Sequence, residues 1–281
     1  MKNPMQLKAA VNKFAKEKNI LPQHAMQNYM LERLLERISV SQYKDYFVIK
    51  GGFLIASMAG LETRSTMDLD ATLKGFHLNE QSIIEIAKNL CNINLDDNIE
   101  FRLKHIEQIR EKDTYSGFRI SFSALYYPMN VSVSIDITTG DKITPRECAY
   151  SYRLMFENRE INILAYNLAT LLAEKLETVI SRGDLNTRPR DYYDIFILEK
   201  LRGSEINIVD LKAALAATSK HRNTEKILEK YNEIMDSVMQ SKEMNKYWQE
   251  YSKKNAYAKG IIFSETCKTV IRIMDKIYTE H

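Results

Sequence analysis

The stretch that decides the fold is Tyr46-Phe47-Val48-Ile49-Lys50-Gly51-Gly52, followed after fifteen intervening residues by Asp68-Leu69-Asp70. Residues 46–49 form a short apolar run, which predicts a buried strand. The glycine pair follows directly and leads into residues 53–59, FLIASMA, which we expect to form a short helix that ends near Gly60. A glycine turn between a strand and a helix lets the backbone approach a phosphate closely, and the free N–H groups at the helix start then face the anion.

The two aspartates lie in residues 66–73, which alternate like a strand. Residues two apart on a strand point to the same face, so the carboxylates of Asp68 and Asp70 should project together. Carboxylates that close repel each other unless one is protonated or a cation lies between them. Mg²⁺ (or Mn²⁺) suits this arrangement, because it takes carboxylates together with phosphate oxygens. Each piece alone favours a plain turn or a solvated edge, but their joint order favours a functional site.

A third carboxylate, Asp136, lies in the strand-like residues 130–137. The apolar residues alternate with polar ones there: Val131, Val133, Ile135 and Ile137 share one face, and Ser132, Ser134 and Asp136 share the other. Taken alone, this pattern is typical of a strand with one exposed polar face. The alternative is that Asp136 lies on a strand adjacent to Asp68 and Asp70 and completes a three-carboxylate metal site.

The rest of the chain predicts an α+β fold, with a mixed-sheet half followed by a helical half. Helices are expected over 5–18, 23–38 and 79–92, and further strands over 99–105, 117–125 and 130–137, with a hairpin at 152–164. Six helices should follow, over 166–182, 191–201, 207–218, 223–238, 241–254 and 262–279. We therefore expect two domains, residues 1–165 and 166–281.

Composition bounds the class of protein. The chain has 281 residues, of which 44% are hydrophobic and 27% charged, so disorder and fibrous folds are excluded. The net charge of +3 hides an uneven distribution. Residues 1–50 carry nine basic and four acidic side chains, whereas residues 51–100 carry three basic and eight acidic ones. A bound divalent cation is one possible reason for the acidic block.

The three cysteines and the five histidines exclude other classes of site. Cys91, Cys148 and Cys267 are far apart and odd in number, which predicts free thiols in a reducing compartment. No HExxH motif is present, so a zinc hydrolase is not expected. The chain has neither an apolar signal core at its N-terminus nor an 18-residue apolar run. A cytoplasmic protein without membrane contact is therefore expected.

The motifs resemble the DNA polymerase β-like nucleotidyltransferase superfamily, whose core is a glycine turn, a helix, a DxD strand and a third acid on a later strand. Lys50-Gly51-Gly52 with Arg64-Ser65-Thr66-Met67-Asp68-Leu69-Asp70 is similar to the signature of the AbiEii/AbiGii toxin family. Downstream, Lys175 and Arg190-Asp191-Tyr192-Tyr193-Asp194 resemble that family's second motif. The resemblance spans roughly residues 45–200.

Alternatives stay open for the downstream residues. Lys175 lies at the edge of an apolar helical stripe, where a lysine either reaches water or takes an anionic partner. Asp191 precedes a helical run, so capping is as good a reason for it as catalysis. Arg64 is either a surface charge or a phosphate ligand, and Arg190 pairs with an acid or with phosphate. The resemblance implies an active-site role for Asp191, with Asp194 second.

The resemblance also implies a mechanism, in which an acceptor hydroxyl attacks the α-phosphorus of an NTP and pyrophosphate leaves. The metal ligands would be Asp68, Asp70 and Asp136, and the catalytic residues would be these three with Lys175 and Asp191. The NTP would be held by Lys50, Gly51, Gly52, Arg64, Ser65, Lys175, Arg190 and Asp194.

The implied biology is a type IV toxin that inhibits the producing cell unless a cognate antitoxin, encoded nearby, counters it. The expected acceptor is RNA, above all transfer RNA, which the lysines at both ends of the chain would contact. A small-molecule nucleotidyltransferase, such as one that modifies an antibiotic, uses the same core and is the main alternative. A non-catalytic nucleotide-binding interaction protein is disfavoured, because the aspartates and the lysine are all present.

Overall fold

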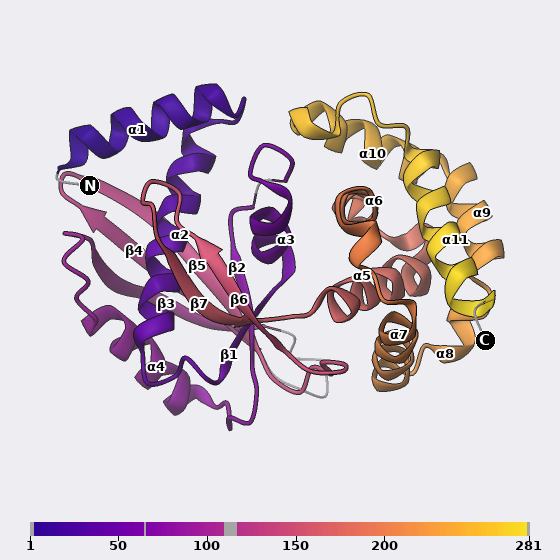
Figure 1. The fold of residues 1–281 in the computed structure, drawn as a ribbon, viewed down its shortest axis with the longest axis horizontal. Coiled ribbons are helices and arrows are strands. Elements are labelled where there is room, and N and C mark those ends of the chain that lie inside the picture. The colour runs from indigo at the N-terminus through magenta and orange to yellow at the C-terminus, as the bar shows by residue number, and fades with distance from the viewer. Residues whose placement is uncertain (1–2, 65, 110–116, 280–281) are drawn as a thin grey trace. The chain divides into compact units, whose positions relative to one another are not determined.

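The computed structural model describes residues 3–64, 66–109 and 117–279. The chain divides into two compact units (Figure 1). The sheet unit comprises Met1–Asp141 and Cys148–Ala165, and the helical unit comprises Lys142–Glu147 and Tyr166–His281. Strands end at residue 165 and helices follow from residue 168 to residue 279, so the predicted α+β class is confirmed.

The sheet unit is built on one mixed sheet. In the described part of the chain, seven strands follow one another in space as β3-β4-β5-β2-β1-β7-β6. Their bounds are β1 (Phe47–Lys50), β2 (Leu69–Leu73), β3 (Glu100–Ile109), β4 (Gly117–Tyr126), β5 (Met129–Thr138), β6 (Cys148–Arg153) and β7 (Glu160–Ala165). Strand β1 is antiparallel to β2 and parallel to β7, and the central strand β2 is parallel to β5. The strand that carries the DxD motif therefore lies inside the sheet.

Four helices of the described sheet unit surround these strands: α1 (Pro4–Glu17), α2 (Pro22–Val40), α3 (Gly51–Ala59) and α4 (Glu80–Asn92). Pro22 opens α2 at its first turn, where a missing N–H costs nothing. Helix α2 lies across the strands and contacts β5 and β7, and α4 contacts β3 (Figure 1). Helix α3 starts at the glycine pair and contacts β1 and β2.

The two faces of the sheet differ in chemistry. On β5, Val133, Ile135 and Ile137 are buried, while the polar residues between them are only partly covered or exposed. On β4, Phe118, Ile120 and Phe122 are likewise buried and alternate with less covered polar residues. The face opposite the apolar side chains, here called the polar face, carries Lys50, Asp70, Arg119, Ser121, Ser134 and Asp136.

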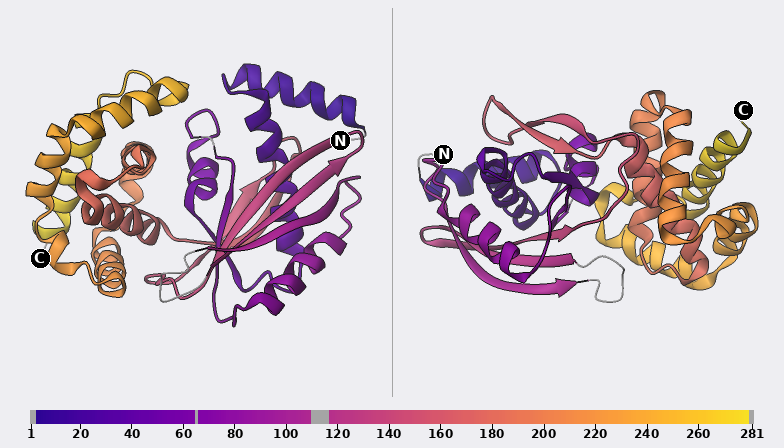
Figure 2. Two further views of the ribbon diagram at one scale, coloured as in Figure 1. Left: turned by 180° about the vertical axis from the view of Figure 1, so that it is seen from behind. Right: turned by 90° about the horizontal axis from the view of Figure 1, so that it is seen from below.

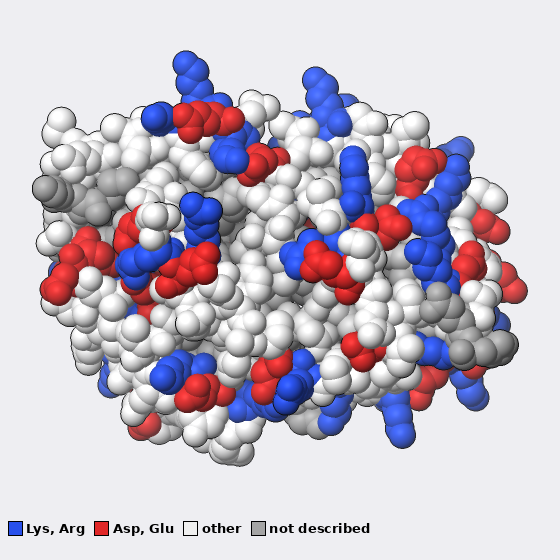
Figure 3. Space-filling model, in the orientation of Figure 1, with Lys and Arg blue, Asp and Glu red and all other residues white. Residues whose placement is uncertain are grey.

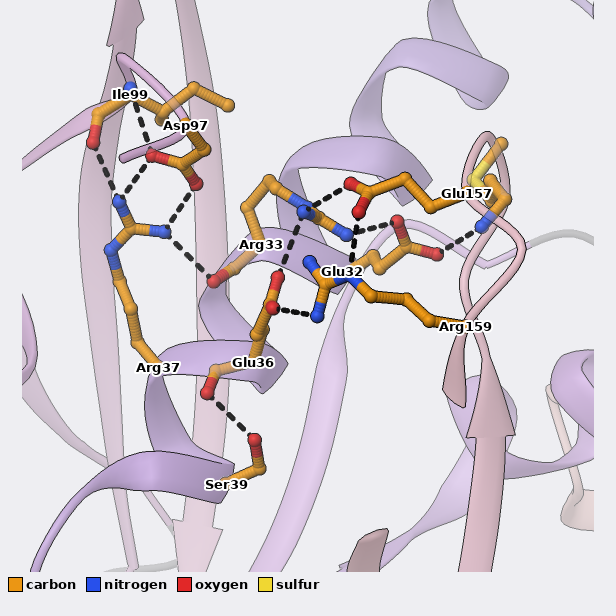
Figure 4. A network of polar contacts seen from close by, with 10 residues as sticks. Glu32, Arg33, Glu36, Arg37, Ser39, Asp97, Ile99, Glu157 and Arg159 are labelled. Carbon is orange, nitrogen blue, oxygen red and sulfur yellow. Dashed lines mark hydrogen bonds and ion pairs between the residues drawn. The ribbon is translucent and has the colours of Figure 1, made fainter. Parts of the chain in front are cut away.

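Helix α2 brings a network of charged side chains into the core (Figure 4). Arg33 is 1% exposed and pairs with Glu32 at 2.7 Å, Glu36 at 2.8 Å and Glu157 at 2.9 Å. Glu32 also accepts a hydrogen bond from the backbone N–H of Met155 at 2.6 Å. The network therefore joins α2 to the turn between β6 and β7, because a buried charge needs a partner.

In the same network Arg37 holds the loop before β3. Its guanidinium donates to both carboxylate oxygens of Asp97 at 2.9 Å and to the carbonyl of Ile99 at 2.6 Å (Figure 4). Arg37 is 1% exposed, so its charge is balanced within the protein. Two ends of the sheet, at β3 and at the β6–β7 turn, are thus attached to one helix.

The stability of the sheet unit should depend on pH through Glu32. Burial raises the pKa of Glu32 to about 7, against Arg33 and the Met155 N–H, which lower it. The folded chain then keeps a proton that the unfolded chain releases near its ordinary pKa of 4.5, so this contribution to stability is lost as pH rises from about 4.5 to 7. Glu32→Gln cannot titrate and should escape that loss.

The difference in free energy of unfolding, Glu32→Gln minus wild type, should therefore increase between pH 5 and pH 8, by up to about 3 kcal/mol. Urea unfolding at several pH values measures it. The fixed cost of removing one partner of Arg33 cancels in this comparison. Glu85→Gln, at an exposed site on α4, is the control. A pH-independent difference would contradict the prediction.

The helical unit contains α5 (Leu168–Arg182), α6 (Pro189–Arg202), α7 (Ile208–Arg222), α8 (Glu225–Leu228), α9 (Tyr231–Gln240), α10 (Lys242–Lys254) and α11 (Phe263–Thr279) (Figure 2). The prediction of one helix over 223–238 is wrong. The chain leaves the helical conformation at Lys230, whose N–H bonds to the Ile227 carbonyl in a tight turn. None of the described helices is long and apolar enough to cross a membrane.

The segment Lys142–Glu147 belongs to the helical unit although β6 and β7 follow it in sequence. Thr170 is fully buried, and its hydroxyl donates to the Thr144 carbonyl at 2.8 Å and accepts the Thr144 N–H at 3.0 Å. The Asn167 amide donates to the carbonyls of Thr144 and Arg146 at 3.0 and 2.7 Å. The first turn of α5 therefore holds this segment.

Candidate active site

A row of charged residues crosses the polar face of the sheet. Asp136 on β5 lies in register with Arg119 on β4 and with Asp70 on β2, and Asp70 lies in register with Lys50 on β1. Asp68 lies beside this row, one residue before the strand begins, and accepts a hydrogen bond from the Ser134 hydroxyl at 2.8 Å. The structure thus places the three sequence-predicted carboxylates Asp68, Asp70 and Asp136 on one face of two paired strands.

The glycine pair leaves room for two side chains of the protein itself. Gly51 has a positive φ of 67°, and a Cβ there would lie 2.3 Å from Oδ2 of Asp70. A Cβ on Gly52 would lie 3.0 Å from the guanidinium of Arg64, a side chain that is buried against this turn. Asp70 therefore takes its position because Gly51 has no side chain. Ser65, predicted to bind nucleotide, lies outside the described residues.

Lys50 already has an anionic partner within the sheet unit. Its side chain is buried, its ammonium donates to the Thr138 hydroxyl at 2.7 Å, and it forms an ion pair with Asp141. Burial alone would raise the pKa of Asp141, but Lys50 and the Thr138 hydroxyl hold it well below its usual range. The pair joins the strand before the glycine turn to the end of β5. The sequence did not single out Asp141.

Arg119 is the second residue that sequence reasoning missed. Its guanidinium donates to both carboxylate oxygens of Asp136, at 2.7 and 2.8 Å, and lies 3.8 Å from Glu107 on β3. The hydrogen bond to Asp136 and the charges of Asp136, Asp68 and Glu107 raise the pKa of Arg119. A signal was present in the sequence, because a hairpin turn at Tyr127-Pro128 brings residue 119 opposite residue 136.

The carboxylates suit a hard divalent cation in their chemistry. Asp68, Asp70 and Asp136 offer oxygen ligands from one face, as Mg²⁺ prefers. In their present geometry, however, Asp136 has both oxygens bonded to Arg119. Across residues 3–64, 66–109 and 117–279, no three His, Cys, Asp or Glu side chains stand together as a finished ligand cluster. A cation bound by all three carboxylates would therefore require Arg119 to move.

The downstream motif forms a cluster inside the helical unit. The Lys175 ammonium on α5 lies 2.5 Å from Oδ1 of Asp191 and 2.9 Å from Oδ2 of Asp194, both on α6. Asp194 is fully buried and Asp191 is 4% exposed. Burial would lower the pKa of Lys175, but Asp194 and Asp191 raise it above its ordinary value. The motif residues are therefore one another's partners.

The start of helix α6 shows that Asp191 is not its N-cap residue. The residue at the N-cap of α6 is Arg188, and Asp191 lies in the first turn with its side chain on Lys175. The carboxylate there still favours the helix dipole. Arg190 is exposed on the same turn. Lys175, Asp191 and Asp194 come together in the helical unit, whereas Asp68, Asp70 and Asp136 come together in the sheet unit.

The sequence over residues 33–261 matches the family described as nucleotidyl transferase AbiEii toxin, type IV TA system. The chain belongs to the AbiEii toxin family. The resemblance drawn from the motifs is thereby confirmed. The AbiEii-family protein is a nucleotidyltransferase toxin of a type IV toxin–antitoxin system, which implies an NTP substrate and a cognate antitoxin.

Two solved structures share the fold of this AbiEii-family toxin. JHP933 from Helicobacter pylori is 14% identical, with a TM-score of 0.53 over 91% of this chain and 92% of that chain. A candidate nucleotidyltransferase from H. pylori is 15% identical, with a TM-score of 0.53 over 93% of this chain and 100% of that one. At these identities the likeness concerns the fold alone. No curated protein matches the chain.

The cluster of Lys175, Asp191 and Asp194, here called the lysine cluster, should make a large contribution to the stability of the toxin. Lys175→Met removes the ammonium that pairs with two buried carboxylates, and breaking such a buried pair from one side costs about 3–5 kcal/mol. Urea unfolding measures this loss. Lys220→Met, at an exposed site on α7, removes the same charge without a buried partner and should cost far less. Equal losses in the two variants would show that the cluster is not an obligate ion pair.

Proposed function

We propose that this toxin transfers a nucleotide from an NTP to an RNA acceptor, with transfer RNA as the expected acceptor, and releases pyrophosphate. The observation that supports the site is the row on the polar face, in which Asp70 and Asp136 lie in register and Asp68 lies beside them. Family membership supplies the reaction class.

Within this proposal, Asp68, Asp70 and Asp136 are the residues that would hold Mg²⁺ or Mn²⁺. A cation bound there supplies charge neutralisation for the phosphates and for the leaving pyrophosphate. Gly51 fixes Asp70 by leaving space for its carboxylate, and Arg64 lies against Gly52, where a guanidinium can reach phosphate. Lys50 acts through Asp141, because their ion pair sets the position of the glycine turn.

The proposed roles of the helical unit follow from the lysine cluster. Lys175 supplies a positive charge for phosphate, held ready by Asp191 and Asp194. Of these two carboxylates we assign the active-site role to Asp191, since Asp194 has no exposed surface with which to meet a substrate. Arg190 is exposed on the first turn of α6 and is proposed as a further phosphate contact.

RNA would be bound through its phosphates by exposed lysines. Lys8, Lys13 and Lys16 lie exposed on α1, and Lys253 and Lys254 at the end of α10. On the face drawn in Figure 3, cationic and anionic side chains are interspersed. Binding through such scattered cations should weaken steeply with salt, because each phosphate contact releases counterions.

The deciding experiment incubates the full chain with each radiolabelled NTP in turn and total RNA. Label in a discrete RNA band supports the proposal, and the size of the band identifies the RNA class. Label in a small acceptor such as an aminoglycoside, offered in a parallel reaction, would instead establish the small-molecule alternative. No turnover of any NTP with either acceptor would overturn both.

A further inference from the structure

The guanidinium of Arg119 places a positive charge of the protein itself among carboxylates that should attract a metal cation. Three carboxylates lie together on the polar face. The guanidinium donates hydrogen bonds to one of them, Asp136, and interacts electrostatically with a second, Asp68. Lys50, at the other end of the row, forms its ion pair with Asp141. In this state Arg119 supplies the positive charge at Asp136 that a divalent cation would supply there in the loaded enzyme.

The guanidinium and a divalent cation compete for the same oxygens. Both oxygens of Asp136 accept from the fork of Arg119, so neither has its best lone pair directed to a metal. A cation at Asp136 would also lie next to a permanent positive charge. The Arg119 guanidinium can move away from Asp136, because 38% of its side chain is exposed. Its ion-pair partners, Asp136 and Glu107, are side chains and not fixed backbone groups.

We propose that Arg119 is a built-in counter-ion that a divalent cation displaces from Asp136, and that the released guanidinium then binds a phosphate of the incoming NTP. The inference rests on the proposed metal site. The planar fork that now fits the carboxylate of Asp136 fits a phosphate equally well. Loading of the cation and capture of the nucleotide are thereby linked through one side chain.

The first test measures Mn²⁺ binding to the full chain without nucleotide, by the loss of the free-ion electron paramagnetic resonance signal. Arg119→Gln should bind Mn²⁺ about tenfold more tightly than wild type, which is within the usual range of coupling between contacting groups. Asp136→Asn should bind it more weakly. In the Asp136→Asn background, Arg119→Gln should change the affinity by less than about twofold.

The double variant separates displacement from simple charge removal. If Arg119→Gln tightens Mn²⁺ binding as much without the Asp136 carboxylate as with it, the gain comes from charge at a distance and the proposal is overturned. Unchanged Mn²⁺ affinity in Arg119→Gln also overturns it. Arg102→Gln is the matched control, because it removes an exposed guanidinium on β3 that pairs with Glu100 and should alter nothing.

The second test measures binding of a non-hydrolysable NTP at saturating Mn²⁺. Arg119→Gln should now bind about tenfold more weakly, opposite in direction to its effect on the metal alone. Arg119→Lys keeps the charge but not the planar guanidinium. Its nucleotide affinity should therefore fall between those of wild type and Arg119→Gln. Unchanged nucleotide affinity in Arg119→Gln would remove the phosphate-binding half of the proposal.

The metal site itself is tested separately. Asp68→Asn and Asp70→Asn should abolish Mn²⁺ binding if the proposed site is right. If these two variants lose Mn²⁺ binding and Arg119→Gln leaves Mn²⁺ affinity unchanged, the counter-ion proposal is refuted and the proposed function stands. Full Mn²⁺ binding in both variants refutes the metal site and the counter-ion together.

Discussion

Asp70→Asn is expected to reduce nucleotide transfer by about a thousandfold, while the fold stays intact. Asp70 lies in the middle of the charged row, in register with Asp136 on one side and Lys50 on the other, and its carboxylate rests against Gly51. The amide has nearly the same shape but no charge, so it keeps the packing and loses the attraction for a cation. The initial rate of label incorporation measures the effect.

Asp68→Asn should behave in the same way, because its carboxylate lies on the same face, next to Ser134. Glu85→Gln serves as control for the loss of one carboxylate elsewhere in the sheet unit, and should leave the rate within about twofold. Circular dichroism and the urea midpoint establish that each variant is folded. A rate within tenfold of wild type in Asp70→Asn would refute the assignment of this row as the catalytic site.

Gly51→Ala should disable the enzyme by a different route. A Cβ at this position would lie 2.3 Å from Oδ2 and 2.7 Å from Cγ of Asp70, so the carboxylate must move. A displacement of about 1 Å at a reacting centre is enough to cost about a hundredfold in rate. The positive φ of 67° adds strain of about 1–2 kcal/mol for any residue with a Cβ.

Gly75→Ala separates the two effects. Gly75 has nearly the same φ, 69°, but nothing lies within 4 Å of a Cβ placed there. In urea unfolding, Gly75→Ala should therefore be less stable than wild type by the strain energy alone, and it should keep its transfer rate. Gly51→Ala should lose at least as much stability and, in addition, its activity. If both variants keep full activity, the close contact between Gly51 and Asp70 has no catalytic meaning.

The fold was largely predictable from local patterns. The apolar run, glycine pair and alternating segments predicted β1, α3, β4 and β5 to within a few residues, because burial on one face leaves a direct mark on the sequence. The break at Lys230 was missed, since the apolar periodicity continues across it. The DxD strand begins at Leu69 rather than at residue 66, yet the side chains of Asp68 and Asp70 still share the expected face.

The partners within the site were less predictable. Lys50 meets Asp141 from 91 residues away, and no local pattern reports which distant strand end will lie beside it. Lys175 was expected to reach water or to take an anionic partner, and the structure shows that its partners are Asp191 and Asp194 of its own motif. Residue types and spacing reveal which side chains matter, but long-range register decides which of them neutralise one another.

The six residues Lys142–Glu147 have a consequence for how the toxin is made. They leave the ribosome before β6 and β7, yet their hydrogen-bonding partners on α5 are synthesised later, after residue 165. The helical unit therefore cannot complete its first contacts until the sheet unit has received its last strand. Neither unit is encoded by one continuous piece of the gene. A fragment that ends at residue 165 carries the irregular segment Lys142–Glu147 of the helical unit, and a fragment that begins at residue 166 lacks the carbonyls that Asn167 and Thr170 bind. A toxin interlaced in this way reaches its finished form only as a whole chain.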